Sequence, residues 1–299
     1  LGKPSKENII STLYEDVDIF PGGVYASINN LSSFSDQIDY ITVIGREYKE
    51  FLNESSAQNI QNKWIWSRDF PTTKKTRFVE RGDKLKKIFE IYKMNDDLIA
   101  ESIESDIHQL LDDKLSDYDI VIVNDYGHGL FTERLIKILL AKSQFLAINA
   151  QINSGNHGFN IVTKYSGATY YCIDLSEARM ALNSKYIEIE EIPEALQQIT
   201  HGRFVTVTLG SQGSISSDGE KTSTFMPAML EDVVDSMGAG DAYYALSAPI
   251  LLLSGSLELA AFVGNVAGAI EVGIPGLSDS ISKKHFLEKL STFWQGCSS

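Results

Sequence analysis

The chain has 299 residues, of which 43% are hydrophobic, and its 26 basic and 40 acidic residues give a formal net charge of −14. This composition suffices for a full hydrophobic core in one or two domains and argues against a fibre or a disordered chain. The negative charge argues against non-specific binding to nucleic acid or to an anionic membrane. A local basic cluster could still bind a phosphorylated small molecule.

Cysteine content and the lack of targeting segments indicate the compartment. Cys172 and Cys297 are too few for a disulfide framework and fit a reducing environment. We find no signal peptide and no apolar run near the ~20 residues of a membrane span. We therefore expect a cytoplasmic protein. The first residue is Leu1 rather than Met, which suggests part of a longer polypeptide.

The first third of the chain predicts a helix, a strand and a hairpin. Weak β-type runs in residues 1–20 end at Pro21-Gly22-Gly23, after which we expect a helix over 24–34 and a buried strand over 39–45. Residues 72–79 alternate, so that Thr73, Lys75 and Arg77 share one face of a strand. A turn at 82–83 leads to a second strand over 86–92, which predicts a hairpin.

After residue 95 helices and strands alternate. Helices are expected over 97–112, 132–143, 176–182, from 193 to 198 and over 262–271; strands are expected over 118–123, 145–149, 168–173 and 203–209. The continuous apolar strands predict a mostly parallel sheet with helices on both faces. Ligands bind such sheets outside the carboxyl ends of the strands. The candidate loops are therefore 124–129, 149–156, 210–213 and 235–241.

The run Gly238-Ala239-Gly240-Asp241 comes directly before an apolar segment with a helical pattern. Three small residues let the backbone approach a ligand closely, and their N–H groups at a helix start suit an anion. A carboxylate beside that anion could accept the proton of a hydroxyl that attacks a phosphoryl group. The alternative is a simple glycine turn with an acidic residue in the first helical turn.

Residues 235–241, Asp-Ser-Met-Gly-Ala-Gly-Asp, resemble the signature Asp-Thr-x-Gly-Ala-Gly-Asp of the ribokinase/PfkB family of carbohydrate kinases. The resemblance implies a ribokinase-like α/β fold with a small β lid. It also implies an ATP-dependent phosphotransferase in which Asp241 is the catalytic base. The amides of Gly238, Ala239 and Gly240 would form the anion hole for the transferred phosphate. Ser236 stands where Thr is usual and keeps a hydroxyl.

Residues 206–215 predict a strand, a glycine turn and a second strand, and a plain β-turn is the structural alternative. The run also resembles the Val-Thr-x-Gly-x-x-Gly segment of the family. That resemblance implies that Thr208, Gly210 and Gly213 lie along the ATP site. It also implies a position beside the adenine for Asn265, which is otherwise an ordinary polar residue of a helix.

Residues 21–30 resemble the sugar-binding signature near the family's N-terminus, which implies substrate contacts for Gly22, Gly23 and Asn30. Ala26 stands where the signature usually has Asn. This departure removes one expected sugar contact.

Most of residues 20–290 resembles the kinase half of the bifunctional heptose 7-phosphate kinase/heptose 1-phosphate nucleotidylyltransferases, through residues 71–77, 124–129 and 165–177. The resemblance implies that Asp125 approaches the sugar. It also implies that Lys75 and Arg77 pair with a substrate phosphate, which suits fixed cations. The alternative for these two cations is a solvated strand face.

The resemblance also implies metal ions. Magnesium would accompany ATP, with Glu177 ordering a magnesium-bound water. Asp235 could help to hold a monovalent cation such as K⁺ together with a closing loop that contains Gly276 and Ser278.

Some segments depart from the family pattern. We find no opening strand that carries a substrate-binding Asp. Asn149-Ala-Gln151 replaces the usual Asp-Pro-Lys or Asp-x-Asn, and Asp174 replaces an Asn. The run 149–156 is rich in amides, which suits either recognition of sugar hydroxyls or a structural loop.

We therefore expect one kinase domain over residues 1–299, with a lid built from parts of 5–22 and 72–92. The expected activity is phosphorylation of a sugar or sugar phosphate, and a heptose phosphate is one candidate. A homodimer paired through the lids would cover exposed strand edges. The alternatives are a non-catalytic nucleotide-binding or scaffold module, partnered with a nucleotidylyltransferase domain, and a nucleoside or vitamin kinase.

Overall fold

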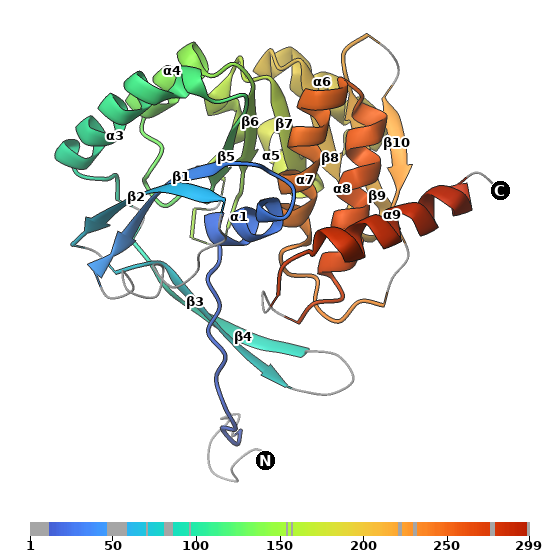
Figure 1. Ribbon diagram of the computed structural model, residues 1–299, viewed down its shortest axis with the longest axis horizontal. Helices are drawn as coiled ribbons and strands as arrows, with labels where there is room; N and C mark the ends of the chain where they lie inside the picture. The colour runs from blue at the N-terminus through green and yellow to red at the C-terminus, as the bar shows by residue number, and fades with distance from the viewer. Residues whose placement is uncertain are drawn as a thin grey trace.

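Six strands form the central sheet of the computed structural model, in the order β10-β9-β8-β7-β6-β5 (Figure 1). Their bounds are β5 (Val121–Asp125), β6 (Leu146–Ala150), β7 (Tyr170–Asp174), β8 (Phe204–Thr208), β9 (Gly213–Ser217) and β10 (Thr224–Pro227). Strands β5 to β8 are parallel, and β9 and β10 are antiparallel to their neighbours. The predicted mostly parallel sheet is confirmed.

The structure describes residues 12–46, 59–69, 71–80, 86–95, 97–153, 155–156, 158–220, 223–229, 232–275 and 279–297. Its α-helices are α1 (Val24–Ser32), α3 (Glu101–Lys114), α4 (Glu133–Lys142), α5 (Leu175–Ala181), α6 (Ile192–Thr200), α7 (Ala239–Ser254), α8 (Leu257–Glu271) and α9 (Lys283–Cys297). Short 3-10 turns are η2 (Leu115–Asp117), η3 (Val162–Tyr165), η4 (Ile189–Glu191) and η5 (Gly210–Gln212). Within these residues no helix has both the length and the apolar character needed to cross a membrane.

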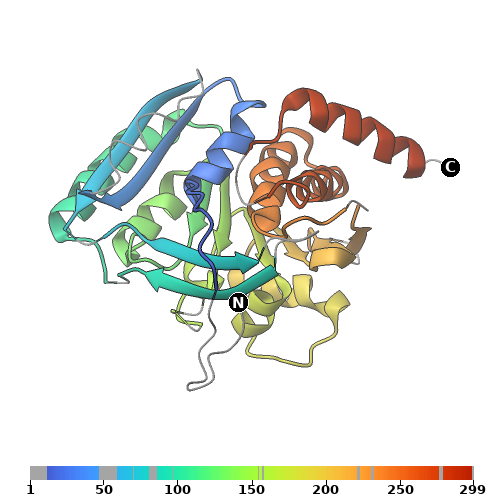
Figure 2. The ribbon, with the colours of Figure 1, turned by 90° about the horizontal axis from the view of Figure 1, so that it is seen from below.

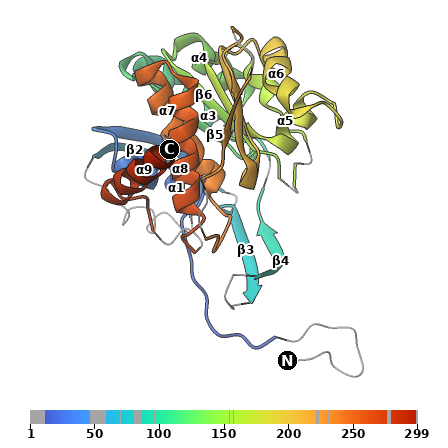
Figure 3. The ribbon, with the colours of Figure 1, turned by 90° about the vertical axis from the view of Figure 1, so that its right-hand side faces the viewer.

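Helices cover both faces of the sheet. Figure 3 shows α5 and α6 on one face, and α7 and α8 on the other. One core cluster joins Ile148 and Val205 to side chains from α3 to α6, whereas a second joins Ala147 and Tyr170 to α7 and α8. The period-2 alternation of side chains along each strand accounts for this division, because both faces are apolar.

Local capping explains where several helices begin. Thr132 accepts the N–H of Leu135 at the start of α4, and Ser256 accepts the N–H of Leu259 at the start of α8. A reciprocal capping box between Asp174 and Glu177 starts α5 directly at the end of β7. The starts of α4 and α5 lie at the carboxyl edge of the sheet, because each helix follows a parallel strand.

The N-terminal part differs from the prediction in one respect. The strand expected at 39–45 exists as β1 (Ile38–Gly45), but it pairs in parallel with β2 (Ile60–Arg68) in a separate two-stranded sheet and is only partly buried. In the described part of the chain no strand of the central sheet precedes β5.

The predicted hairpin is confirmed as β3 (Lys74–Glu80) and β4 (Lys86–Lys93), an antiparallel pair (Figure 2) that projects from the body of the molecule (Figure 1). We call it the lid hairpin. Residues 12–20, expected to contribute strands to the lid, form none, and residues 5–11 lie outside the described chain. Residues 12–20 nevertheless line the same cavity as the lid hairpin.

Candidate active site

A cavity of about 1910 Å³ opens at the carboxyl edge of the sheet. Its walls come from the ends of β5, β6 and β7, the start of α7, the start of α1 and the lid hairpin. Sites for one drug-sized ligand measure about 300–1,000 Å³. This cavity therefore has room for two ligands side by side.

Asp241 lies in the first turn of α7, at the inner end of the cavity. The turn before it depends on glycine: Gly238 adopts a left-handed φ of 82° as the N-cap, a conformation in which other residues are strained. A Cβ added to Gly240 would meet nothing within 4 Å, so the backbone here faces open space. The first amides of a helix lack intrahelical acceptors, so Ala239, Gly240 and Asp241 offer N–H groups to an anion at this point.

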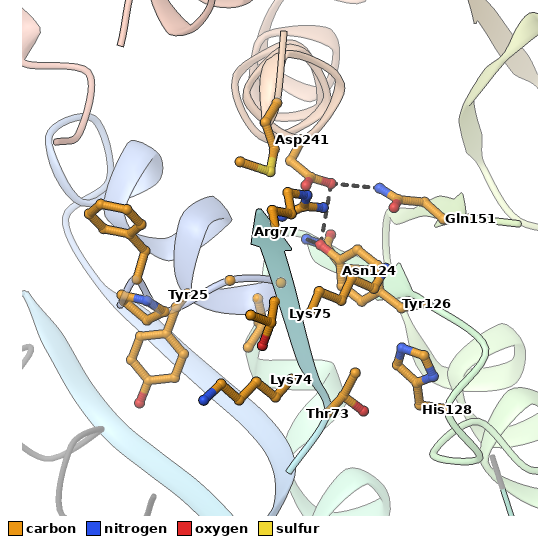
Figure 4. Close-up of a pocket in the computed structure, with 18 of the residues that line it drawn as sticks. Tyr25, Thr73, Lys74, Lys75, Arg77, Asn124, Tyr126, His128, Gln151 and Asp241 are labelled. Atoms are coloured by element: carbon orange, nitrogen blue, oxygen red, sulfur yellow. Dashed lines mark hydrogen bonds between the residues drawn. The ribbon is translucent and has the colours of Figure 1, made fainter. Parts of the chain in front are cut away.

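The carboxylate of Asp241 is held by two neutral donors (Figure 4). Gln151 Nε2 donates to its Oδ1 at 2.7 Å, and the Tyr126 hydroxyl donates to the same oxygen at 3.2 Å. Burial raises the pKa of Asp241 to about 6, while these hydrogen bonds and the charge of Lys75 limit the rise. Asp241 is therefore mainly ionised above about pH 6.

The predicted basic residues of the lid hairpin have different partners. Lys75 lies near enough to Asp241 to lower its pKa, with its Nζ 5.3 Å from the centre of the Tyr92 ring. Arg77 forms an ion pair with Glu90 on the neighbouring strand, with Nε and Oε1 2.5 Å apart. Both residues line the cavity, but Arg77 already has a carboxylate partner.

The residues predicted along the ATP site are only partly brought together. Thr208 lines the cavity, whereas Gly210, Gly213 and Asn265 are not among the described residues that do. A Cβ on Gly213 would lie 2.1 Å from the Met226 carbonyl oxygen, so this glycine permits the close pairing of β9 and β10. Asn265 is buried and donates to Ser214 Oγ and to the Ala261 carbonyl. These two residues serve packing here.

Only some of the predicted sugar-binding residues line the cavity. Gly22 and Gly23 line the cavity, and Gly23 adopts a φ of 62° against the Tyr126 ring. Asn30 differs from the prediction, because its buried side chain donates to Glu271 Oε2 at 3.5 Å and accepts the Ile281 N–H at 3.0 Å. Asn30 thus joins α1 to α8 and lies outside the cavity lining.

Asp125 lines the cavity, and its contact with the sugar stays a prediction. Its buried carboxylate accepts the Tyr165 hydroxyl at 2.8 Å and the Gly127 N–H at 2.9 Å, and it pairs with Lys164 at 2.5 Å. With these three partners, the carboxylate organises the loop after β5. The sequence did not indicate these contacts, because Lys164 and Tyr165 lie far along the chain.

Glu177, the predicted outer ligand of magnesium, lines the cavity with both oxygens in use. Oε1 accepts the Ile152 N–H and Oε2 accepts the Asp174 N–H. Burial, followed by the Asp174 carboxylate, raises the pKa of Glu177 to about 8. No group of three or more His, Cys, Asp or Glu side chains able to hold a metal occurs in the described residues.

Asp235, the predicted monovalent-cation ligand, is buried and carries a lysine partner. Lys87 of the lid hairpin places its Nζ 3.2 Å from Oδ1 of Asp235, which also accepts the Met237 N–H at 3.1 Å. The ammonium thus supplies one positive charge at the place where K⁺ was expected. Gly276 and Ser278 lie outside the described residues.

The amide-rich run acts largely as a structural loop. Asn153 donates to the Tyr126 carbonyl, and Asn160, just beyond the run, donates to the carbonyls of Asp125 and Gln151. Sequence reasoning missed Gln151 and Tyr126 as partners of Asp241. The available signal was their position, because each follows a strand of the parallel sheet directly.

The fold and this site define an open-sheet α/β protein in which a helix begins at the cavity with a carboxylate in its first turn. The model of the pfkB family of carbohydrate kinases matches residues 11–284. The chain therefore belongs to the pfkB carbohydrate kinase family.

Curated relatives and solved structures agree with this family. The bifunctional protein HldE of Campylobacter jejuni subsp. doylei is 27% identical over 269 residues, which cover 89% of this chain and 55% of the relative. The HldE of Shewanella piezotolerans is 26% identical over 279 residues and is likewise covered to 55%. The chain thus spans about half the length of the curated relatives it matches.

The fold is ribokinase-like. The chain is similar to phosphofructokinase-2 from Escherichia coli in complex with potassium, with a TM-score of 0.74, 14% identity, and coverage of 95% of this chain and 93% of that one. It is also similar to ribokinase from Thermotoga maritima, with a TM-score of 0.70, 16% identity, and coverage of 97% and 94%.

The buried carboxyls predict how stability depends on pH. Burial raises the pKa of Glu177 to about 8 and that of Glu271 to about 7, above the ordinary value near 4.3. A carboxyl with a raised pKa binds more protons in the folded chain, so its contribution to stability is lost as the pH rises through that pKa. We expect the free energy of unfolding in urea to fall between about pH 5 and pH 8.

Glu271→Gln should flatten this fall, because the buried group then no longer titrates. Glu258→Gln, an exposed position of the same helix, is the matched control and should leave the slope unchanged. If the free energy of unfolding in urea has the same pH dependence in the wild type, Glu271→Gln and Glu258→Gln, the raised pKa of Glu271 is contradicted.

Proposed function

We propose that this protein transfers the γ-phosphoryl group of ATP to a hydroxyl of a sugar or sugar phosphate, with Asp241 as the general base. The observation that supports this most directly is the Asp241 carboxylate at the start of α7, inside a cavity large enough for two ligands. A pKa of about 6 suits a base that works near neutral pH, because most of the carboxyl is then ionised and still basic.

The proposed step moves one proton and one phosphoryl group. Asp241 accepts the proton of the acceptor hydroxyl as its oxygen attacks the γ-phosphorus, and the β–γ bridging bond breaks with its electron pair leaving on ADP. Amides of Ala239, Gly240 and Asp241 stabilise the charge on the phosphoryl oxygens. Their preorganisation rests on the left-handed conformation of Gly238.

Magnesium bound to ATP would supply charge neutralisation on the phosphates. Of the predicted ligands, Glu177 lines the cavity and could order a magnesium-bound water; both its oxygens already hold backbone N–H groups. For the nucleotide itself, Thr208 is the predicted contact that reaches the cavity. We do not assign K⁺ to Asp235, because the Lys87 ammonium supplies the charge there.

A heptose phosphate is the acceptor that we propose, supported by the similarity to the HldE proteins over most of this chain. Gly22 and Gly23 at the start of α1 border the space for the sugar, and Lys75 could pair with its phosphate. Those relatives are bifunctional by name. We therefore propose that this kinase domain works with a nucleotidylyltransferase domain, either fused to it or on a separate chain.

Asp241→Asn should lower phosphoryl transfer by at least about 100-fold, the order expected for loss of a general base, while ATP binding persists. The measurement is ADP release across pentoses, hexoses, heptoses and their phosphates. Asp232→Asn, an exposed position shortly before the turn, is the control and should retain full activity.

Near-normal turnover in Asp241→Asn would remove Asp241 from the mechanism. ATP binding without ADP release for every acceptor in the panel would instead favour a scaffold.

Lys75→Met should raise KM for a phosphorylated acceptor by about tenfold, because a charge-assisted hydrogen bond to phosphate is lost. Lys93→Met removes the same charge from an exposed position at the end of β4, which is not among the described residues that line the cavity, and should change KM little. The two values come from initial rates at saturating ATP. Equal KM values for the two variants would mean that Lys75 does not bind the substrate phosphate.

We propose that a second copy of the chain covers the lid hairpin. Phe78, Val79, Ile88, Phe89 and Ile91 are each 38–53% exposed on it. Exposed apolar patches of this kind commonly mark protein interfaces. Sedimentation velocity should find a dimer that Phe89→Asp/Ile91→Asp converts to a monomer, and a monomeric wild-type chain at micromolar concentration would exclude the pairing.

A further inference from the structure

The loop between β6 and η3 holds Gln151 firmly by its main chain. The Gln151 N–H donates to the Asp125 carbonyl at 2.8 Å, and its carbonyl accepts Asn160 Nδ2 at 3.0 Å. Asn160 Nδ2 also donates to the Asp125 carbonyl at 3.0 Å, which ties this loop to the end of β5. Because both sides of its peptide backbone are bonded, Gln151 has a fixed position from which its side chain extends to α7.

Tyr126 is fixed in a similar way. Its carbonyl accepts Asn153 Nδ2 at 2.8 Å, and its ring lies beside Gly23, where an added Cβ would come within 3.3 Å of the ring. The Tyr126 hydroxyl accepts a hydrogen bond from Asn124 Nδ2 at 3.5 Å and donates its own proton to Asp241. The amides of this region thus brace the two residues that reach Asp241.

Both donors bind one oxygen of the carboxylate. Gln151 Nε2 and the Tyr126 hydroxyl both donate to Oδ1, and in the described residues no hydrogen bond of Asp241 to another side chain ends on Oδ2. The orientation of the Gln151 amide follows from its partner, because a carboxylate oxygen can only accept. The two oxygens of Asp241 therefore have different surroundings.

We propose that Gln151 and Tyr126 are positioning residues that hold Oδ1 of Asp241 and leave Oδ2 as the atom that takes the acceptor proton. This inference rests on the proposed kinase function. When the acceptor O–H bond breaks, its proton passes to Oδ2, the oxygen bonds to the γ-phosphorus, and ADP leaves with the electron pair. Two donors on Oδ1 fix the carboxyl plane, so that Oδ2 points to one place in the cavity.

Other charged and titratable groups act on Asp241 from every neighbouring element. Lys75 of β3 favours its ionised form, and Glu177 of α5 and Glu271 of α8 lie close enough to interact with its charge, as do Cys172 of β7 and Tyr244 of α7. Gln151 and Tyr126 are neutral, so they orient the carboxylate without the large loss of basicity that a second cation would cause.

The test is a titration of Asp241 in the full chain, followed by ¹³C NMR of carboxyl-labelled aspartate and assigned with Asp241→Asn. In the wild type we expect a pKa of about 6. Gln151→Leu should raise it by about one unit, because a hydrogen bond to the charged form is lost. Gln151→Lys should lower it. Gln144→Leu removes an exposed glutamine that binds the Ser116 carbonyl, and this control should leave the titration unchanged.

Tyr126→Phe keeps the ring and loses only the hydroxyl, so it provides a second variant if Gln151→Leu fails to fold. It should raise the pKa by less than Gln151→Leu, since its hydrogen bond is longer. A folded Gln151→Leu or Tyr126→Phe chain with an unchanged Asp241 titration would overturn the inference.

Kinetics separates positioning from substrate binding. The acid limb of kcat/KM should move with the pKa of Asp241 in each variant, while KM for the acceptor changes by less than about twofold. A higher KM with an unmoved pH profile would assign Gln151 to the substrate instead and overturn the inference. If the wild type phosphorylates no acceptor, the proposed function fails, whereas the NMR titration still decides whether the two residues hold Asp241.

Discussion

The site depends on one constraint, which is that the half-buried Asp241 carboxylate at the start of α7 forms no ion pair with any described residue. Burial raises the pKa of Asp241, and the hydrogen bonds from Tyr126 and Gln151, together with the charge of Lys75, keep the ionised form accessible near neutral pH. Those donors come from the loops after β5 and β6, so the helix, two strands and two loops must meet at the same edge of the sheet. Parallel strands make this meeting possible, because their carboxyl ends lie together.

Several polar residues in or near the cavity hold the framework together through hydrogen bonds and ion pairs. Asp125 is held by Lys164 and Tyr165, and Asn30 joins α1 to Glu271 of α8. Buried polar groups of this kind must be hydrogen-bonded, since leaving one unpaired costs about 1–3 kcal/mol. The framework therefore uses residue types that, in sequence, resemble ligand contacts.

The lid hairpin contacts both the cavity and the segment just before α7. Its strand β3 brings Lys75 over the cavity, while Lys87 of β4 pairs with Asp235, a few residues before the anion site. The Lys87 ammonium is only partly exposed and the Asp235 carboxylate is buried, so the pair is less screened by solvent than a surface pair. A movement of the hairpin would therefore displace Lys87 from Asp235 and change the charge near the start of α7.

Local patterns in the sequence determined the class of protein. The strand–helix alternation, the glycine turn before Asp241 and the hairpin at 72–92 are each encoded by neighbouring residues, and each was found in the structure. The partners of those residues were decided only by the tertiary structure: Gln151 and Asp241 are 90 positions apart, Tyr126 and Asp241 are 115 apart, and Asn30 and Glu271 are 241 apart. Periodicity and turn chemistry act over a few residues, whereas these contacts depend on which strand ends the fold brings together.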